Sequence, residues 1–308
     1  MNQRKWDFLP LTLLLLLLTA YFVAGWKASP CAGSILSALG AVVVILLIGR
    51  ILYVINRKML TGSSLLPPLF YAFLATAHPA AFCFSTLHVA ALLLAVSLYS
   101  YLCFNALAPS MSRLASMWLT LGCAGLLLPA LLWLAPVYAI TSVSKADDKL
   151  KFWFITLFGL AIPTATWLVI TYLMGDTTPA SEIFVHDWEE MTAIHHPTFY
   201  HSTPALCRIL IVAVVSLVAM GGIFSRLSTY KTSQFHACLR LIVLTLCLGV
   251  LALIFWGDTA TPAGLMVMAP ASLLLGLYFE TTRNKKASRT LLVILTLILV
   301  FERISHFV

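Results

Sequence analysis

The sequence predicts an all-α fold, a polytopic bundle of transmembrane helices, and three observations support this. Of its 308 residues, 61% are hydrophobic and 10% are charged, against about 45–50% and about 25% in soluble domains. Apolar runs long enough to cross about 30 Å of hydrocarbon recur along the chain. The runs are continuous, whereas β-barrel strands alternate. A soluble globular fold and intrinsic disorder are both excluded.

Nine apolar runs are predicted to form membrane-spanning helices. In chain order they are 8–26, 34–55, 65–84, 87–107, 152–174, 207–224, 238–256, 263–279 and 290–304. The stretch 112–143 has two interpretations, one long kinked helix or two short helices that turn at Leu128–Pro129. Proline is tolerated at the first position of a helix, as the second interpretation requires.

The distribution of basic residues decides between these two interpretations. A hairpin in 112–143 leaves 16 of the 19 lysines and arginines on the cytoplasmic side, whereas a single crossing leaves 8. Cytoplasmic segments carry the excess of Lys and Arg. We therefore expect about eleven helices in one integral membrane domain, 1–308, with the N-terminus in the cytoplasm, where Arg4 and Lys5 lie.

The apolar run from Phe8 to Ala24 also resembles a signal peptide, but it exceeds the usual h-region of about 7–15 residues. No small-x-small cleavage site follows it, so we expect a retained first helix. The net charge of +8 follows from membrane topology, and nucleic acid is not expected as a partner. Seven cysteines without a CxxC pair predict small apolar side chains rather than disulfides or zinc ligands.

One long segment, 175–206, is hydrophilic, and the topology places it in the periplasm. It contains five of the eleven acids and four of the eight histidines, but no lysine or arginine. Its centre, FVHDWEEMTAIHH, is compatible with a short amphipathic helix in which Phe184, Trp188 and Met191 share a face. The segment is either functional or a solvated acidic loop that caps the bundle.

Carboxylates near imidazoles suit a general base, so this segment and a second outer turn supply the candidate catalytic acids. They are Asp187, Glu189, Glu190 and Asp258. Asp258, in WGDTATPAG, has the alternative role of capping the next helix. Candidate substrate-binding residues are His186, Trp188, His195, His196 and, within the third apolar run, His78. The spacing matches no metal-ligand pattern, so we expect no metal and no cofactor.

Two stretches carry resemblances to known families, over roughly residues 50–175. The sequences SRLASMWLTLGCAGLLLPALLWLAPVYAI and KADDKLKFWFITLFGLAIP resemble the middle of polytopic GT-C class glycosyltransferases. The preceding LPPLFYAFLATAHP and LHVAALLLAVSLYSYL resemble an uncharacterised family of multi-pass inner-membrane proteins of the Bacteroidota. The glycosyltransferase resemblance implies an essential acid in the first outer loop. Here that loop, WKASPCAGS, has no carboxylate.

Three hypotheses about function follow. The first is an inner-membrane enzyme that handles a lipid-linked sugar at the outer face, with a polyprenyl-linked substrate and an acid of the 175–206 loop or Asp258. The second is a non-enzymatic scaffold or assembly subunit whose polar loop docks a periplasmic or membrane protein partner. The third is a transporter of a lipidic substrate. All three place the chain in the inner membrane, among membrane lipids.

Overall fold

The computed structural model is helical throughout the part of the chain that it describes, without a β-strand in that part. The described residues are 35–60, 64–75, 81, 83–106, 109–174, 213–214, 217–225, 232–255, 260–282, 286, 290–295 and 297. The elements are α2 (Ile35–Met59), α3 (Leu66–Ala75), α4 (Thr86–Ala106), α5 (Met111–Leu127), the 3-10 helix η3 (Pro129–Trp133), α6 (Leu134–Val143), α7 (Lys149–Leu173), α10 (Thr232–Phe255) and α11 (Ala260–Thr281).

Within the described ranges, four helices are long and apolar enough to cross a membrane. They are α2, Thr86–Asn105 of α4, α7 and Gln234–Ala252 of α10. Shorter apolar helices accompany them. The predicted all-α class is confirmed, and the chain has the features of a helical membrane protein. The count of eleven helices and the orientation of the N-terminus stay predictions, because the run 8–26 lies outside the described residues.

The predicted break inside 112–143 is confirmed, since α5 ends at Leu127 and a 3-10 turn begins at Pro129. Leu128 is extended, at φ −151° and ψ 92°. A residue before proline is driven out of the helical region by clash with the proline ring. Ser110 begins α5 by accepting the N–H of Arg113. A sequence-local steric effect thus determines where this helix ends.

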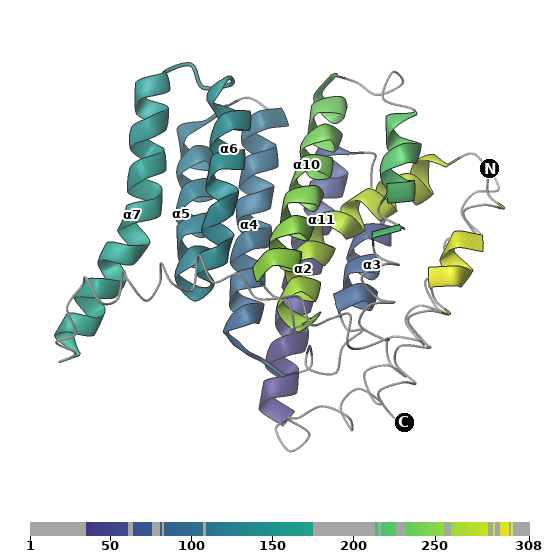
Figure 1. Cartoon of the computed structure of the whole chain (residues 1–308), viewed down its shortest axis with the longest axis horizontal. Helices are drawn as coiled ribbons and strands as arrows, with labels where there is room; N and C mark the ends of the chain where they lie inside the picture. Colours follow the sequence, from purple (N-terminus) through teal and green to yellow (C-terminus); the bar gives the residue numbers. More distant parts are fainter. Residues whose placement is uncertain are drawn as a thin grey trace.

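Helices α5 and α7 run parallel and pack through small residues. A Cβ on Gly122 would lie 2.9 Å from the carbonyl oxygen of Gly159, and a Cβ on Gly159 would lie 2.5 Å from the Cβ of Trp118. Pro163 has no N–H, so the Gly159 carbonyl lacks its helical donor and faces α5 instead. Close backbone approach at small residues is the usual packing device between membrane helices. Beyond Pro163, α7 slopes away from α5 (Figure 1).

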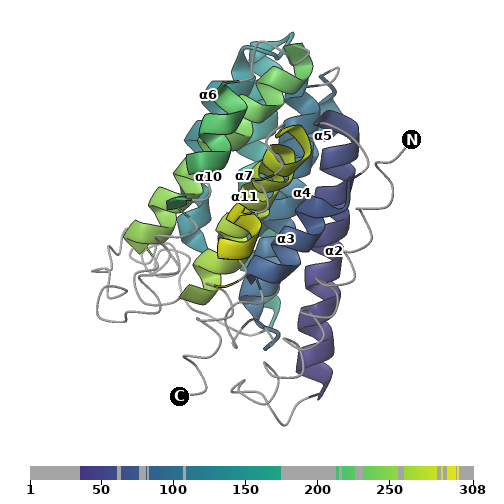
Figure 2. The same ribbon diagram turned by 90° about the vertical axis from the view of Figure 1, so that its right-hand side faces the viewer.

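Side-chain contacts fix the directions of the other helices. The bonds from Ser97 to Met117 O and between Ser100 and Ser116 show that α4 and α5 are antiparallel. The bond from Tyr71 to Leu265 O joins the antiparallel α3 and α11. Figure 2 shows α11 and α3 side by side between α10 and α2, as their contacts require. Helix α4 lies at the centre and packs against α2, α5, α6, α10 and α11.

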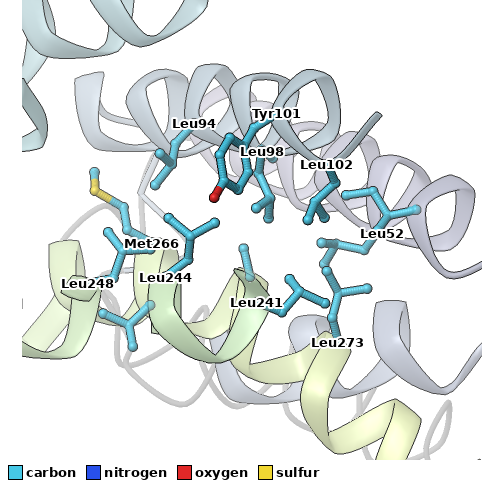
Figure 3. Close-up of a cluster of buried hydrophobic side chains, with 14 of the residues drawn as sticks. Leu52, Leu94, Leu98, Tyr101, Leu102, Leu241, Leu244, Leu248, Met266 and Leu273 are labelled. Atoms are coloured by element: carbon cyan, nitrogen blue, oxygen red, sulfur yellow. The ribbon is translucent and has the colours of Figure 1, made fainter. Parts of the chain in front are cut away.

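The core between α2, α4, α10 and α11 is apolar (Figure 3). Leu98 and Leu102 of α4 face Leu241 and Leu244 of α10 there, and all four side chains are buried. The hydroxyl of Tyr101 points from α4 toward α10. Lipid chains are as apolar as leucine, so this packing depends on shape rather than on escape from water.

Charged residues gather at one end of the bundle, which we call the charged end. Between Ile35 and Thr282 the described charged residues are Arg50, Arg57, Lys58, Arg113, Lys145, Asp147, Asp148, Lys149, Lys151, Arg240 and Glu280. They lie toward the C-terminal ends of α2 and α11, the N-terminal ends of α5 and α10, and the α6–α7 connection. The opposite, uncharged end has no described charge between the same residues.

Candidate functional site

All nine candidate site residues from the sequence lie outside the described residues. They are His78, His186, Asp187, Trp188, Glu189, Glu190, His195, His196 and Asp258. The structure therefore tests neither their positions nor the order of the 175–206 segment. It does describe the helices from which these segments depart.

Those helices finish at the same end of the bundle. The segment with His78 follows Ala75 of α3, the 175–206 segment follows α7, and the segment with Asp258 follows Phe255 of α10. Helix α3 is antiparallel to α11, α7 is parallel to α5, and α10 begins at the charged end with Arg240. All three helices therefore end at the uncharged end, opposite the basic residues.

His88, near the start of α4 at the uncharged end, has a structural role. Its Nε2 lies 2.9 Å from the carbonyl oxygen of Ala81 and its Nδ1 lies 3.2 Å from the hydroxyl of Ser85. A carbonyl only accepts, so Nε2 carries the proton and Nδ1 accepts from the serine. Both ring nitrogens are thus occupied, and His88 fixes the chain that precedes α4.

The most prominent buried polar group in the described part is Arg240 of α10. Only 9% of its surface is exposed, and its Nη1 has no hydrogen-bond partner among the described residues. The guanidinium lies next to the hydroxyl of Tyr101. A buried cation between membrane helices is costly and is commonly functional. In the sequence, Arg240 is one of the 16 basic residues counted on the cytoplasmic side, and nothing local marks it as buried.

A directed chain of hydrogen bonds leads away from Arg240. Tyr101 Oη lies 2.7 Å from Thr141 Oγ1, and Thr141 Oγ1 lies 2.6 Å from the carbonyl oxygen of Val137. The threonine hydroxyl donates to that carbonyl, so it accepts from the tyrosine, and the lone pairs of the tyrosine oxygen are left to the neighbouring guanidinium of Arg240. Each donor points away from the positive charge. The chain joins α10, α4 and α6 at one depth.

A second set of polar contacts joins α4 and α6 near the bond between Tyr101 and Thr141. Asn105 Nδ2 donates to the hydroxyl of Ser142 and to the carbonyl of Tyr101, each at 2.9 Å. All three residues are buried. Buried polar groups in lipid need partners within the protein, so this layer specifies how α4 and α6 align.

A third contact joins the charged ends of α2 and α11. Asn56 is fully buried and its Nδ2 lies 3.0 Å from Glu280 Oε1. The side-chain amide of Gln234 of α10 donates to the backbone carbonyl of Leu60, which follows α2. These bonds hold the chain between α2 and α3 against α10 and α11. The sequence analysis missed them because each pair is distant along the chain and no local pattern marks it.

The described residues contain no group of three or more His, Cys, Asp or Glu side chains that could hold a metal ion. Cys83, Cys103, Cys123, Cys238 and Cys247 form no disulfide bond there.

Comparison with known proteins adds no relative. No protein-family model matches the chain, and no curated protein or solved structure matches it significantly. The resemblances stated above stay predictions.

Proposed function

We propose that the protein is a multi-pass inner-membrane protein that handles a lipid-linked sugar at the uncharged end of the bundle, facing outward. One observation supports this most. The helices α3, α7 and α10, which precede the segments with the candidate acids and histidines, finish at that end. The basic residues lie at the opposite end, as expected for a cytoplasmic face.

In this proposal a polyprenyl-linked substrate enters between helices and presents its headgroup at the outer surface. Asp187, Glu189, Glu190 or Asp258 acts as the general acid or base. Trp188 anchors the segment at the interface, where tryptophan is enriched. His78, His186, His195 and His196 contact the sugar or phosphate.

Amide variants test the proposal, because Asp→Asn and Glu→Gln keep the volume and remove the charge. We expect that at least one of Asp187→Asn, Glu189→Gln, Glu190→Gln and Asp258→Asn inserts normally yet abolishes turnover of a polyprenyl-phosphate sugar. Glu182→Gln, in the same segment, is the matched control and should retain activity. If all four variants turn over substrate as the wild type does, these acids are not catalytic.

The proposed topology has its own test. A reporter fused after Lys151 should be cytoplasmic and one fused after Thr192 periplasmic. The opposite pair of results would remove both the eleven-helix arrangement and the outer site.

A second candidate function, a scaffold for a membrane partner, is favoured by α7. This helix contacts only α5 and α6 closely among the described elements, and most of its large apolar side chains are exposed. A partner helix could lie along it in the membrane. If the amide variants are active in cells but α7 variants lose a co-purifying protein, the scaffold function replaces the enzymatic one.

A further inference from the structure

Lys58, Tyr99 and Arg113 come from three adjacent helices, α2, α4 and α5, at the charged end. Lys58 of α2 lies with its Nζ 3.0 Å from the hydroxyl of Tyr99 of α4 and 5.5 Å from the centre of that ring. Arg113 lies in the first turn of α5, one turn before Ser116, whose hydroxyl lies 3.1 Å from that of Ser100, the neighbour of Tyr99. Lys58 is exposed, and Tyr99 and Arg113 are half-buried.

The start of α5 adds to the positive potential of this cluster. Ser110 caps the helix by accepting the N–H of Arg113, and the first turn contains no acid. The first N–H groups of a helix lack partners within the helix and form the positive end of its dipole. Two cationic side chains and a helix N-terminus therefore face the same place.

The exposed side of α2 shows how this place lies relative to the membrane. From the start of the helix that side is apolar, and near its end it becomes basic. Its apolar members are Ile35, Leu36, Leu39, Val43, Leu46 and Leu47. Arg50, Arg57 and Lys58 continue the same exposed side. An apolar surface that ends in cations is what a lipid molecule requires, with acyl chains along the helix and headgroup at its end.

We propose that Lys58, Tyr99 and Arg113 form a site for the phosphate of an anionic phospholipid, in the leaflet at the charged end. The site is separate from the outer site proposed above and does not depend on it. Tyr99 accepts from Lys58 and holds its ammonium group at this place. Arg113 supplies a planar donor pair suited to phosphate, and Lys58 supplies a point charge.

The alternative explanation is that these cations only follow membrane topology. A general surface attraction acts on every basic residue near an anionic leaflet, wherever it lies at that end. A built site instead distinguishes Lys58 and Arg113 from other cations at the same end. Lys145 and Lys149, both exposed in and beside the α6–α7 connection, provide that comparison.

The experiment uses the full-length protein in nanodiscs of phosphatidylcholine with a minor fraction of phosphatidylglycerol, and native mass spectrometry of the lipid that stays bound. The wild type should retain phosphatidylglycerol. Lys58→Ala/Arg113→Ala should lower its affinity about tenfold or more, since each charged hydrogen bond contributes at least about that factor. Lys145→Ala/Lys149→Ala removes the same charge and should bind as the wild type does.

Two results would overturn the proposal. Equal loss in the two double variants would show a general surface attraction, and displacement of the lipid by inorganic phosphate at similar concentration would show a site for the free ion. Tyr99→Phe keeps the ring and all charges, and should weaken binding less than the double variant does. If Lys58→Ala/Arg113→Ala fails to fold, Lys58→Gln alone decides, and unchanged affinity would refute the site.

Discussion

Helices α4 and α7 are almost equally apolar, yet they occupy opposite environments. Helix α4 is surrounded by five other helices, and α7 is held mainly by α5 at the edge of the bundle (Figure 1). Only Phe152, Thr156, Gly159 and Pro163 of α7 are buried, all on one face and none beyond Pro163. Hydropathy thus identified both helices as membrane spans but did not distinguish the central one from the peripheral one.

Polar and small residues do distinguish them. The buried face of α4 contains Ser97, Ser100, Tyr101 and Asn105, and each bonds to a neighbouring helix or to its own backbone. The face of α7 that meets protein is marked by Gly159 and Pro163. In lipid a leucine gains little from burial, so close approach and hydrogen bonds select the contacts. The four predictions below test this difference, from the largest expected effect to the smallest.

The largest effect is expected where α7 meets α5. Gly159→Leu places its Cβ against the backbone and Cβ of Trp118 and Leu119, which cannot move without shifting α5. Overpacking costs about 1–3 kcal/mol, and this rigid contact should reach the upper part of that range. Thermal unfolding in detergent should show the loss, and a proteolytic site in α7 should become accessible.

Gly249→Leu is the matched control for that variant. A Cβ at Gly249 of α10 meets nothing within 4 Å. Replacing glycine within a helix removes an entropic cost of roughly 0.5–1 kcal/mol, so this variant should be as stable as the wild type or more so. Equal destabilisation by both variants would mean that the contact between α5 and α7 has no special role.

The second effect concerns the buried polar layer of α4. Tyr101→Phe removes the hydroxyl that Arg240 and Thr141 share, and leaves the guanidinium without its partner. An unpaired buried donor costs about 1–3 kcal/mol. Tyr99→Phe, at a half-buried position of the same helix, should cost far less, because its hydroxyl accepts from the exposed Lys58. The measured quantity is the free energy of unfolding.

Adding Arg240→Met to Tyr101→Phe sharpens this second prediction. The double variant has no buried cation, so it should regain much of the stability that Tyr101→Phe loses. Strictly additive losses in the double-mutant cycle would show that the two side chains do not depend on each other.

A feature of the fold could be predicted from the sequence when the residues that cause it are close together along the chain. The end of α5 at Leu128–Pro129 was predicted because the cause is local, a proline and the residue before it. The runs 34–55, 87–107 and 152–174 agree with α2, α4 and α7 within a few residues, because length and hydropathy determine a membrane helix. The residues of the candidate outer site lie outside the described part of the chain, so that site stays a prediction.

What the sequence did not reveal depends on contacts between distant residues. Arg240 was counted with the cytoplasmic basic residues because it lies near the start of its apolar run, 238–256, whereas α10 begins earlier, at Thr232, and brings Arg240 inside the bundle. The bond of Asn56 to Glu280 likewise exists only once α2 and α11 are side by side. No periodicity within one helix carries that information.

The third effect is small and lies at the start of α7. Backbone N–H groups of Lys151 and Leu150 donate to Asp148, and they hold the pKa of its carboxyl below its usual value. The carboxylate therefore stabilises the folded state at pH values above its unfolded pKa. That contribution disappears as the pH falls through the lowered folded pKa. Asp148→Ala should reduce the melting temperature slightly at neutral pH, and the difference from wild type should vanish in strong acid. A difference that persists unchanged in acid would exclude the capping carboxylate as its cause.

The smallest effect is expected on the outer side of α7, and it separates lipid from a protein partner. Leu157 is 65% exposed, and Leu98 of α4 is 3% exposed. Leu98→Ala, a reference variant outside this ranking, leaves a cavity between helices and should cost about 2–5 kcal/mol. At Leu157→Ala, lipid chains fill the space that the side chain leaves, so the free energy of unfolding in a bilayer or micelle should be unchanged.

The same substitution would weaken a complex if another helix packed there, because a protein surface cannot refill the gap as lipid does. Gentle extraction followed by size-exclusion chromatography distinguishes the two cases. An unchanged elution profile for Leu157→Ala supports a lipid-facing helix, whereas loss of a co-eluting protein means that α7 is an interface and that its exposed face belongs to a larger core.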